Sequence, residues 1–281
     1  MQFTSKFAPT IAGVCAISLA LAGCTSTGDS DQNAAEGPKP TESHGSSPTL
    51  SRIESSGVVK ICTTGDYRPF TYFDPKAKEW SGIDVDMGRT FADDLDAKPE
   101  FVRIDWDEFP SKIRKGACDI GMGGLSITTE RAAQLYMSDP TTQDGKTPIT
   151  QCGKVDKYDS IDKINDDDVE VITPKGGTNE EFAAEHFPEA KVIKWDDNNT
   201  IFDQIIKGKA DVMVTDAPET KWVAHEEPEL CAVNPDKPLN FSEQGYAIRS
   251  GDDQMLEYLN TWLRITQHDG TYAGAEKKWF G

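Results

Sequence analysis

Residues 115–131 read KGACDIGMGGLSITTER and contain a complete passage from helix to strand to helix. We expect a short helix over residues 109–115 that stops at the following glycine, and a strand over residues 119–124. The strand runs into Ser126, and a threonine at 128–129 caps the next helix. The free backbone amides of that helix start would therefore lie beside Ser126, where they favour an anion.

The same junction occurs a second time. Residues 207–212, KGKADV, repeat the Lys-Gly-x-x-Asp-aliphatic pattern of residues 115–120. The repetition indicates two similar lobes, although chance resemblance is the alternative. In open parallel sheets a ligand binds at the carboxyl ends of the strands. If the lobes face one another, residues 123–126 and 215–216 meet across one cleft.

Strands and helices alternate along the rest of the chain. Before residue 115 we expect strands at residues 58–62 and 101–104, with Met87, Phe91 and Leu95 on one helical face. Later strands are expected at residues 169–172, 192–195, 210–215 and 246–248, with helices around Phe182, over residues 200–206 and around Trp262. Such alternation predicts an α/β fold in which helices cover parallel sheets.

The first 50 residues are read as a signal peptide followed by a tether, and not as part of the fold. Lys6 precedes an apolar run at residues 11–21, which is typical of a signal peptide. The run ends in Leu21-Ala22-Gly23-Cys24, which resembles the bacterial lipobox, so we expect residues 1–23 to be removed and Cys24 to carry lipid. An ordinary signal peptide with a stray cysteine is the alternative. Residues 24–50, poor in apolar side chains, are expected to form a flexible tether.

The charge and the cysteine content of the chain argue against several classes of binding partner and cofactor. The formal net charge of -19 argues against nucleic acid as a partner and against electrostatic adhesion to anionic lipid. Export permits disulfide bonds, and Cys62, Cys118, Cys152 and Cys231 allow three pairings. Their spacing does not match a zinc site, and the scattered histidines form no recognisable catalytic triad, so we expect neither a metal nor an organic cofactor.

Two helix starts carry groups that suit a carboxylate ligand. Arg131, in the first turn after Ser126, offers a planar fork, although a surface arginine is the commoner case. Residues 175–180, KGGTNE, join a strand to a helix without the spacing of a P-loop. Thr178 there is a ligand donor or only an N-cap, and Glu180 is a functional acid or only a complement to the helix dipole.

Aromatic side chains follow the predicted strands of the first lobe. Tyr67, Phe70 and Trp106 either stack on a flat ligand or cover a hydrophobic core. The sequence does not distinguish these two roles, because both require an apolar ring at a loop.

Taken together, these stretches resemble the amino-acid-type periplasmic solute-binding family. The matching stretches are GDYRPF at 65–70, GIDVD at 82–86, GLSITTER at 124–131 and TD at 215–216. The resemblance implies a two-lobed clamp joined by two hinge strands. It implies a discontinuous first lobe, over residues 51–147 and 245–281, and a second lobe over residues 148–244.

A narrower resemblance is to the periplasmic cyclohexadienyl dehydratases, which convert prephenate to phenylpyruvate and L-arogenate to L-phenylalanine. It rests on DGKTPIT at 144–150, GGTNE at 176–180, DN and TIF at 197–202, GKAD at 208–211 and PELCAV at 228–233. The match includes Cys152 and Cys231, and implies a bond between them. A second bond between Cys62 and Cys118 is a hypothesis, because both lie in predicted first-lobe strands.

This resemblance also implies the roles of individual side chains. Glu180 matches the expected general acid, which must be protonated near neutral pH. The residues expected to bind a small carboxylate substrate are Thr64, Tyr67, Trp106, Ser126, Arg131, Lys146, Thr178, Asn179 and Asp216. The alternative is an amino-acid receptor, in which Asp216 holds the ligand's ammonium and the anchored protein presents the ligand to a membrane permease.

Overall fold

A computed structural model describes residues 47–280, which belong to one compact unit. The expected signal peptide, Cys24 and most of the tether lie outside these residues. Helix α1, Pro48–Ser56, begins inside the range expected to be tether, because the Ser47 side chain caps it and also donates to Asp252 at 2.9 Å. No helix in the described part of the chain is long and apolar enough to cross a membrane.

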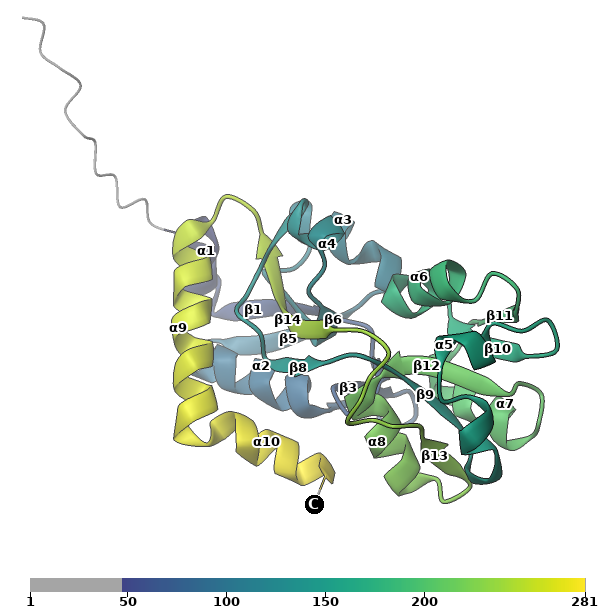
Figure 1. Ribbon diagram of the computed structural model, residues 1–281. Coiled ribbons are helices and arrows are strands. Elements are labelled where there is room, and N and C mark those ends of the chain that lie inside the picture. Colours follow the sequence, from purple (N-terminus) through teal and green to yellow (C-terminus); the bar gives the residue numbers. More distant parts are fainter. Residues whose placement is uncertain (1–46, 281) are drawn as a thin grey trace, which may run out of the picture. The chain divides into compact units, whose positions relative to one another are not determined.

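The first lobe is built on a six-stranded sheet in the order β5-β1-β6-β14-β7, with β8 paired to β14 (Figure 1). Strands β1, β5 and β6 are parallel, and β14 is antiparallel to β6. The strands are β1 (Val58–Thr63), β5 (Lys98–Arg103), β6 (Ile120–Ser126), β7 (Leu135–Met137), β8 (Thr142–Asp144) and β14 (Ser242–Arg249). The helices of this lobe, besides α1, are α2 (Ile83–Asp93), α3 (Phe109–Arg114), α4 (Thr129–Ala132), α9 (Asp253–Asp269) and α10 (Thr271–Phe280).

The second lobe repeats the design with a five-stranded sheet in the order β11-β10-β12-β9-β13. Its strands are β9 (Lys146–Gln151), β10 (Glu170–Pro174), β11 (Lys191–Trp195), β12 (Val212–Asp216) and β13 (Leu230–Ala232). Its helices are α5 (Ile161–Ile164), α6 (Gly177–His186), α7 (Ile201–Ile206) and α8 (Ala217–Glu226). A small sheet of β2 (Asp66–Tyr67), β3 (Thr71–Asp74) and β4 (Glu79–Ser81) adjoins the first lobe, and short 3-10 turns are η1 (Trp106–Glu108), η2 (Cys152–Lys157) and η3 (Asn198–Thr200).

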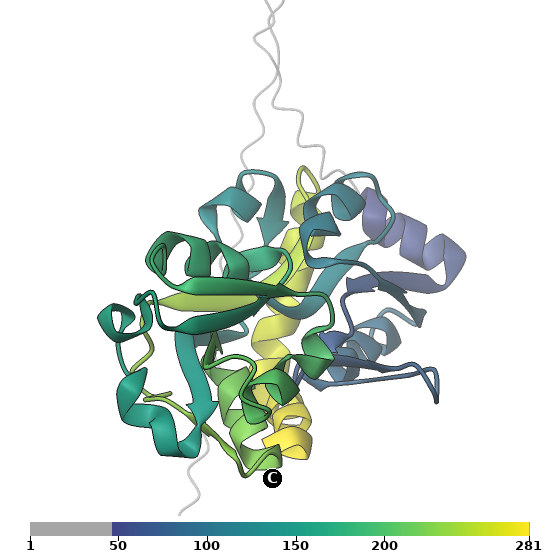
Figure 2. The ribbon, with the colours of Figure 1, turned by 90° about the vertical axis from the view of Figure 1, so that its right-hand side faces the viewer.

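The chain passes between the two sheets twice. It leaves the first sheet at β8 and enters the second directly at β9, and it returns from β13 to β14 (Figures 1 and 2). On its return β14 pairs with β6, Gln244 opposite Ser126, and the final helices α9 and α10 pack in the first lobe. The expected α/β clamp with a discontinuous first lobe is therefore confirmed.

Hydrophobic packing explains which predicted faces are buried. Phe91 of α2 meets Trp262 of α9 edge-to-face, with ring centroids 4.9 Å apart. Leu95 packs against the same core from just beyond the end of α2. Phe70 lies fully inside this core, so of the two roles open to it the structure shows the core-covering one.

Both proposed disulfide bonds are present. Cys62–Cys118 connects β1 to the start of β6, and Cys152–Cys231 connects η2 to β13. Cys62 and Cys118 are also buried members of the first-lobe core. Each bond therefore joins two segments of a single lobe, and neither bond links the two lobes.

We expect removal of the core bond by paired Cys62→Ala and Cys118→Ala changes to lower the free energy of unfolding by roughly 2–5 kcal/mol. The reasons are the lost constraint on a 56-residue separation and the cavity left in the core. Urea unfolding of the double variant measures the loss. The matched control is the pair Cys152→Ala and Cys231→Ala, which spans 79 residues outside the described hydrophobic cores. An equal or larger loss in the control would contradict the contribution assigned to core packing.

Candidate functional site

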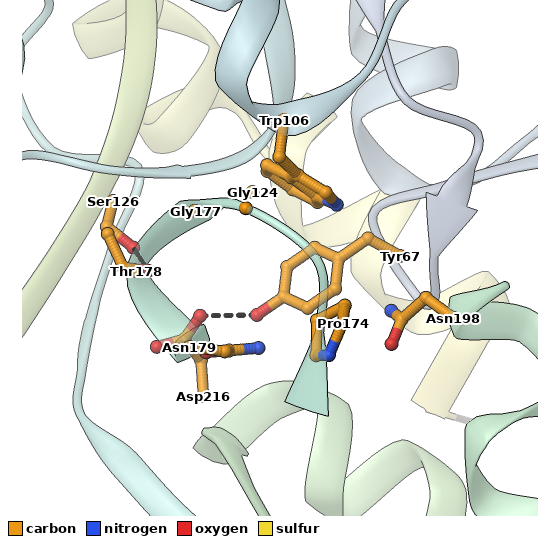
Figure 3. A pocket seen from close by; sticks show the side chains of 11 residues that line it. Tyr67, Trp106, Gly124, Ser126, Pro174, Gly177, Thr178, Asn179, Asn198 and Asp216 are labelled. Carbon is orange, nitrogen blue, oxygen red and sulfur yellow. Dashed lines mark hydrogen bonds between the residues drawn. The ribbon is translucent and has the colours of Figure 1, made fainter. Parts of the chain in front are cut away.

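The ends of the two repeated strands meet across a cavity between the lobes. Ser126 ends β6 and Asp216 ends β12, while Thr178 lies in the first turn of α6. Ser126 Oγ and Thr178 Oγ1 are 3.2 Å apart, so the lobes touch here. The cavity is lined by Tyr67, Trp106, Gly124, Ser126, Pro174, Gly176, Gly177, Thr178, Asn179, Asn198 and Asp216 (Figure 3).

The lobes are closed on one another in this structure. The Tyr67 hydroxyl donates to Asp216 (Figure 3), and Asn198 Nδ2 donates to the backbone oxygen of Asp66 at 2.8 Å. The cavity between them measures about 20 Å³, close to the space of one water-sized sphere. A ring-bearing organic acid therefore enters only when the lobes separate.

Lys146 connects the polar groups of this cavity. Its ammonium lies 2.8 Å from Asp216 Oδ1 and donates to Thr178 Oγ1 at 3.0 Å and to Asn179 Oδ1. The register of β9 against β12 places Lys146 directly opposite Asp216. Both side chains are 3% exposed, so the ion pair is shielded from water and is stronger than a surface pair.

Aromatic rings cover one side of the cavity. Trp106 meets Tyr67 edge-on, with ring centroids 5.3 Å apart (Figure 3). Gly124 is required beneath them, because its φ of 66° lies in the left-handed region and a Cβ there would lie 2.6 Å from the Tyr67 ring. Of the two roles open to these rings, the structure gives Tyr67 and Trp106 a place at the cavity.

Arg131 is buried beside a second, outer cavity. Its Nη1 donates to the backbone oxygen of Ser126 at 2.8 Å, and burial lowers the pKa of its guanidinium. Thr128 caps its helix. The outer cavity, of about 390 Å³, is lined by Trp106, Asp107, Pro110, Thr128, Glu130, Arg131, Gln134, Gly176, Gly177, Glu180, Glu181 and Ala184. The two cavities share Trp106, Gly176 and Gly177, so they are neighbouring parts of one interlobe cleft.

Glu180 lines only the outer cavity. It forms an ion pair with Lys194 and accepts from the backbone amide of Gly176 at 2.6 Å. The bond from Lys194, followed by that from Gly176, lowers the pKa of Glu180. A lowered pKa keeps the carboxyl ionised near neutral pH, whereas a general acid has to be protonated. Glu180 is also not among the groups that Lys146 contacts.

Glu219 is a functional candidate that sequence reasoning missed. It lies in the first turn of α8, is 1% exposed, and accepts from the Thr215 hydroxyl at 2.6 Å. Burial raises the pKa of Glu219 well above its ordinary value, and repulsion from Asp216 and Asp66 adds to this, although the bond from Thr215 opposes it. A signal existed in the sequence: Glu219 follows the predicted strand end at Asp216 by three residues, as a first-turn helix residue.

Thr64 lies outside both cavities. It follows β1, is buried, and accepts from Arg103 through its backbone oxygen at 3.2 Å. The structure thus brings six of the expected binding residues to the inner cavity, namely Tyr67, Trp106, Ser126, Thr178, Asn179 and Asp216. Lys146 contacts three of them, and Arg131 lies in the adjoining outer cavity.

Asp144, where the chain leaves the first sheet, is a further carboxyl whose two oxygens are buried, and it lines a cavity other than the inner and outer ones. Neither of its carboxyl oxygens has a hydrogen-bond partner within residues 47–280. Burial, and then repulsion from Asp216, raises the pKa of Asp144 to about 8, against the opposing effect of Lys146. The folded protein therefore holds a proton on Asp144 that the unfolded chain releases near pH 3.8.

This difference predicts a pH dependence of stability. As pH rises from about 4 to about 8, the free energy of unfolding should fall by up to about 1.4 kcal/mol per pH unit because of Asp144. An Asp144→Asn variant, which has no proton to lose, should show a smaller fall over that range. Urea unfolding at a series of pH values compares the two proteins, and parallel curves would contradict the assignment.

The family of the chain follows from comparison with known proteins. The model of the bacterial extracellular solute-binding proteins, family 3, matches residues 59–281, and the chain belongs to this family. The resemblance inferred from the motifs is therefore confirmed. The family's extracellular description agrees with export.

Two curated relatives represent two different activities. The chain is 39% identical over 230 residues to a cyclohexadienyl dehydratase of Pseudomonas aeruginosa, covering 82% of this chain and 85% of that protein. It is 27% identical over 227 residues to a putative ABC transporter arginine-binding protein of Escherichia coli, covering 79% and 90%.

Solved structures give the same two groups. An ancestral amino acid-binding protein, described as a precursor of cyclohexadienyl dehydratase, superposes with a TM-score of 0.76 at 34% identity, covering 83% of this chain and all of that one (100%). An ancestral cyclohexadienyl dehydratase is 40% identical with a TM-score of 0.52, covering 82% and 95%. Relatedness to dehydratases is thus established on both sequence and fold.

Proposed function

We propose that this protein is a cyclohexadienyl dehydratase, which converts prephenate to phenylpyruvate and L-arogenate to L-phenylalanine. The observation that carries the proposal is Glu219, a buried carboxyl that accepts from Thr215 close to Lys146 and Asp216, and whose raised pKa favours the protonated form. The 39% identity to a cyclohexadienyl dehydratase supports the same reaction.

The reaction needs a proton at one defined place. Prephenate loses its ring carboxylate as CO2, and the electron pair of the broken carbon–carbon bond enters the ring. The carbon–oxygen bond on the opposite side of the ring breaks, and the ring becomes aromatic. Hydroxide is a poor leaving group, so a proton from a neutral acid lets it leave as water and accelerates the step by about 10²–10⁴-fold. The acid is left as a carboxylate and regains its proton from solvent.

Glu219 is better suited to this role than Glu180. Burial raises the pKa of Glu219 and so favours its neutral form, whereas the lowered pKa of Glu180 keeps that residue ionised. Glu219 also lies close enough to Asp216 and Tyr67 for their charges to affect one another. A substrate that separates Tyr67 from Asp216 on entry brings its ring to the start of α8, where Glu219 lies.

The remaining groups bind and orient the substrate. Arg131, with Ser126 and Thr178, takes one carboxylate, because a guanidinium fork matches its two oxygens. Lys146 takes the second charge, and Trp106 packs against the ring. Lobe closure then removes water, which strengthens each of these interactions.

An amino-acid receptor is the second candidate. The buried carboxylate of Asp216 favours it, since an ammonium ligand would pair with that group. Relatives that are described as arginine-binding proteins support it too. In this function the protein would present its ligand to a membrane permease.

We also infer that the protein is exported and anchored by lipid at Cys24 after removal of residues 1–23, on the outer side of the cell membrane. The lipobox-like sequence before Cys24 supports the anchor. Mass spectrometry of the protein from its native membrane tests this: a lipid-modified Cys24 at the amino terminus is expected, and an unmodified residue there would contradict the anchor.

A turnover assay distinguishes the two candidate functions. Protein lacking the first 46 residues is mixed with prephenate, and phenylpyruvate is followed by absorbance. Catalysis predicts many turnovers per protein molecule, whereas a receptor predicts none and tight binding of an amino acid by calorimetry. Absence of phenylpyruvate with folded protein would overturn the dehydratase proposal.

A further inference from the structure

A continuous series of hydrogen bonds leads from Lys146 to Glu219. Lys146 Nζ donates to Asn179 Oδ1, Asn179 Nδ2 donates to Thr215 Oγ1 at 2.9 Å, and Thr215 Oγ1 donates to Glu219 Oε2 at 2.6 Å. The groups come from β9, α6, β12 and α8 in turn. Thr215 is fully buried, and it lines neither the inner nor the outer cavity.

The Lys146 ammonium, which begins this series, determines how the next side chain, Asn179, is oriented. An ammonium has donors and no acceptor, so Asn179 must turn its amide oxygen toward Lys146. Its NH2 group then faces Thr215 and donates to the hydroxyl oxygen. A hydroxyl has one proton and two acceptor lone pairs, so Thr215 can accept from Asn179 and still donate its proton, and in the structure it donates that proton to Glu219 Oε2. Glu219 Oε2 is thus an acceptor, and a proton carried by Glu219 sits on Oε1.

We propose that Thr215 is a positioning residue for Glu219: its hydroxyl holds Oε2 and leaves Oε1 as the oxygen that delivers the proton to the substrate. This inference rests on the proposed dehydratase function. It assigns catalytic importance to a side chain that has no place on the cavity wall. It also explains why Asn179 presents its oxygen to Lys146 and its nitrogen inward.

The charged surroundings of Glu219 set the size of the effect. Asp216 and Asp66 disfavour its ionised form, and Lys146 favours that form. The Tyr67 hydroxyl lies within electrostatic range as well. The bond from Thr215 also favours the ionised form, so it limits how far burial raises the pKa of Glu219. Removing that bond should weaken the acid and free the carboxyl to rotate.

The test uses Thr215→Val, which keeps the shape of the side chain, beside Thr215→Ser, which keeps the hydroxyl. Glu219 is titrated without substrate by infrared difference spectroscopy, with Glu219→Gln as the reference that lacks the band. The Val variant should titrate about one to two pH units higher than the wild type, since a hydrogen bond to a charged group contributes about 1.5–3 kcal/mol. The Ser variant should titrate as the wild type does.

Kinetics supply the second measurement. Thr215→Val should lower kcat for prephenate at least tenfold with KM unchanged, because Thr215 touches no cavity, and Thr215→Ser should restore kcat. A titration that does not shift in the Val variant rejects the role of Thr215, even if the wild type is active. If the Glu219 titration shifts in Thr215→Val but the wild type does not turn over prephenate, Thr215 still controls the Glu219 proton. That result rejects only the dehydratase reaction. Thermal unfolding confirms that both variants are folded.

Discussion

Replacing Glu219 with Gln is expected to lower kcat for prephenate by about 10²–10⁴-fold, the usual contribution of a positioned general acid. The amide has nearly the same shape and still accepts from Thr215, so the fold and the hydrogen bond at 2.6 Å are retained. What is lost is the proton that lets the ring hydroxyl leave as water. Steady-state kinetics of phenylpyruvate formation measure the change, and KM should move little.

Glu180→Gln is the matched control for this variant. Glu180 occupies a comparable first-turn position on α6, but it is paired with Lys194 and is ionised. Its replacement should change kcat by no more than a few-fold. The opposite outcome, in which Glu180→Gln is inactive and Glu219→Gln is active, would return the role of acid to Glu180.

The second large effect is expected on removal of the Lys146 ammonium. In Lys146→Met the Asp216 carboxylate stays buried without its cation at 2.8 Å, and the cleft loses a positive charge that a substrate carboxylate needs. Breaking a buried charge pair in this way costs about 2–5 kcal/mol, which corresponds to roughly 30- to 5000-fold weaker binding of the carboxylate ligand. Calorimetric titration with phenylpyruvate, or the KM for prephenate, measures the loss.

Lys154→Met provides the control for that change. Lys154 also pairs with an aspartate, Asp211 at 3.2 Å, but the pair is partly exposed and neither residue lines the cavity. Exposed pairs contribute about 0–1 kcal/mol, so affinity for the ligand should be unchanged. Equal losses in the two variants would show that the Lys146 effect is not specific to the cleft.

Local sequence patterns predicted most of the elements that position the site. The strand that ends at Ser126 and the strand that ends at Asp216 are both found, and so is the helix that follows Ser126. The helix that follows Asp216, α8, is not among the predicted elements. The predictions that succeed do so because alternation of apolar residues, helix caps and glycine stops are properties of a few neighbouring residues. The pairing of Lys146 with Asp216 depends instead on the register of β9 against β12, which no local pattern contains.

The choice between the two acids shows where local reasoning ends. Glu180 and Glu219 are both first-turn residues that follow a strand, so their local sequence contexts are alike. The Gly176–Gly177 turn, with φ of 74° at each glycine, begins α6 so that Thr178 and Asn179 face the cavity while Glu180 pairs with Lys194. Glu219 is instead buried by the tertiary packing around the start of α8. The pKa that distinguishes the two residues is therefore a property of the assembled fold.

The pH dependence of kcat for prephenate tests the central claim most directly, because Glu219 and Glu180 have pKa values shifted in opposite directions. If buried Glu219 is the acid, kcat should stay level through neutral pH and decline only on the alkaline side. The residual kcat of Glu219→Gln should show no such decline. A kcat that already declines between acidic and neutral pH, as an acid with an ordinary or lowered pKa loses its proton, would contradict the account.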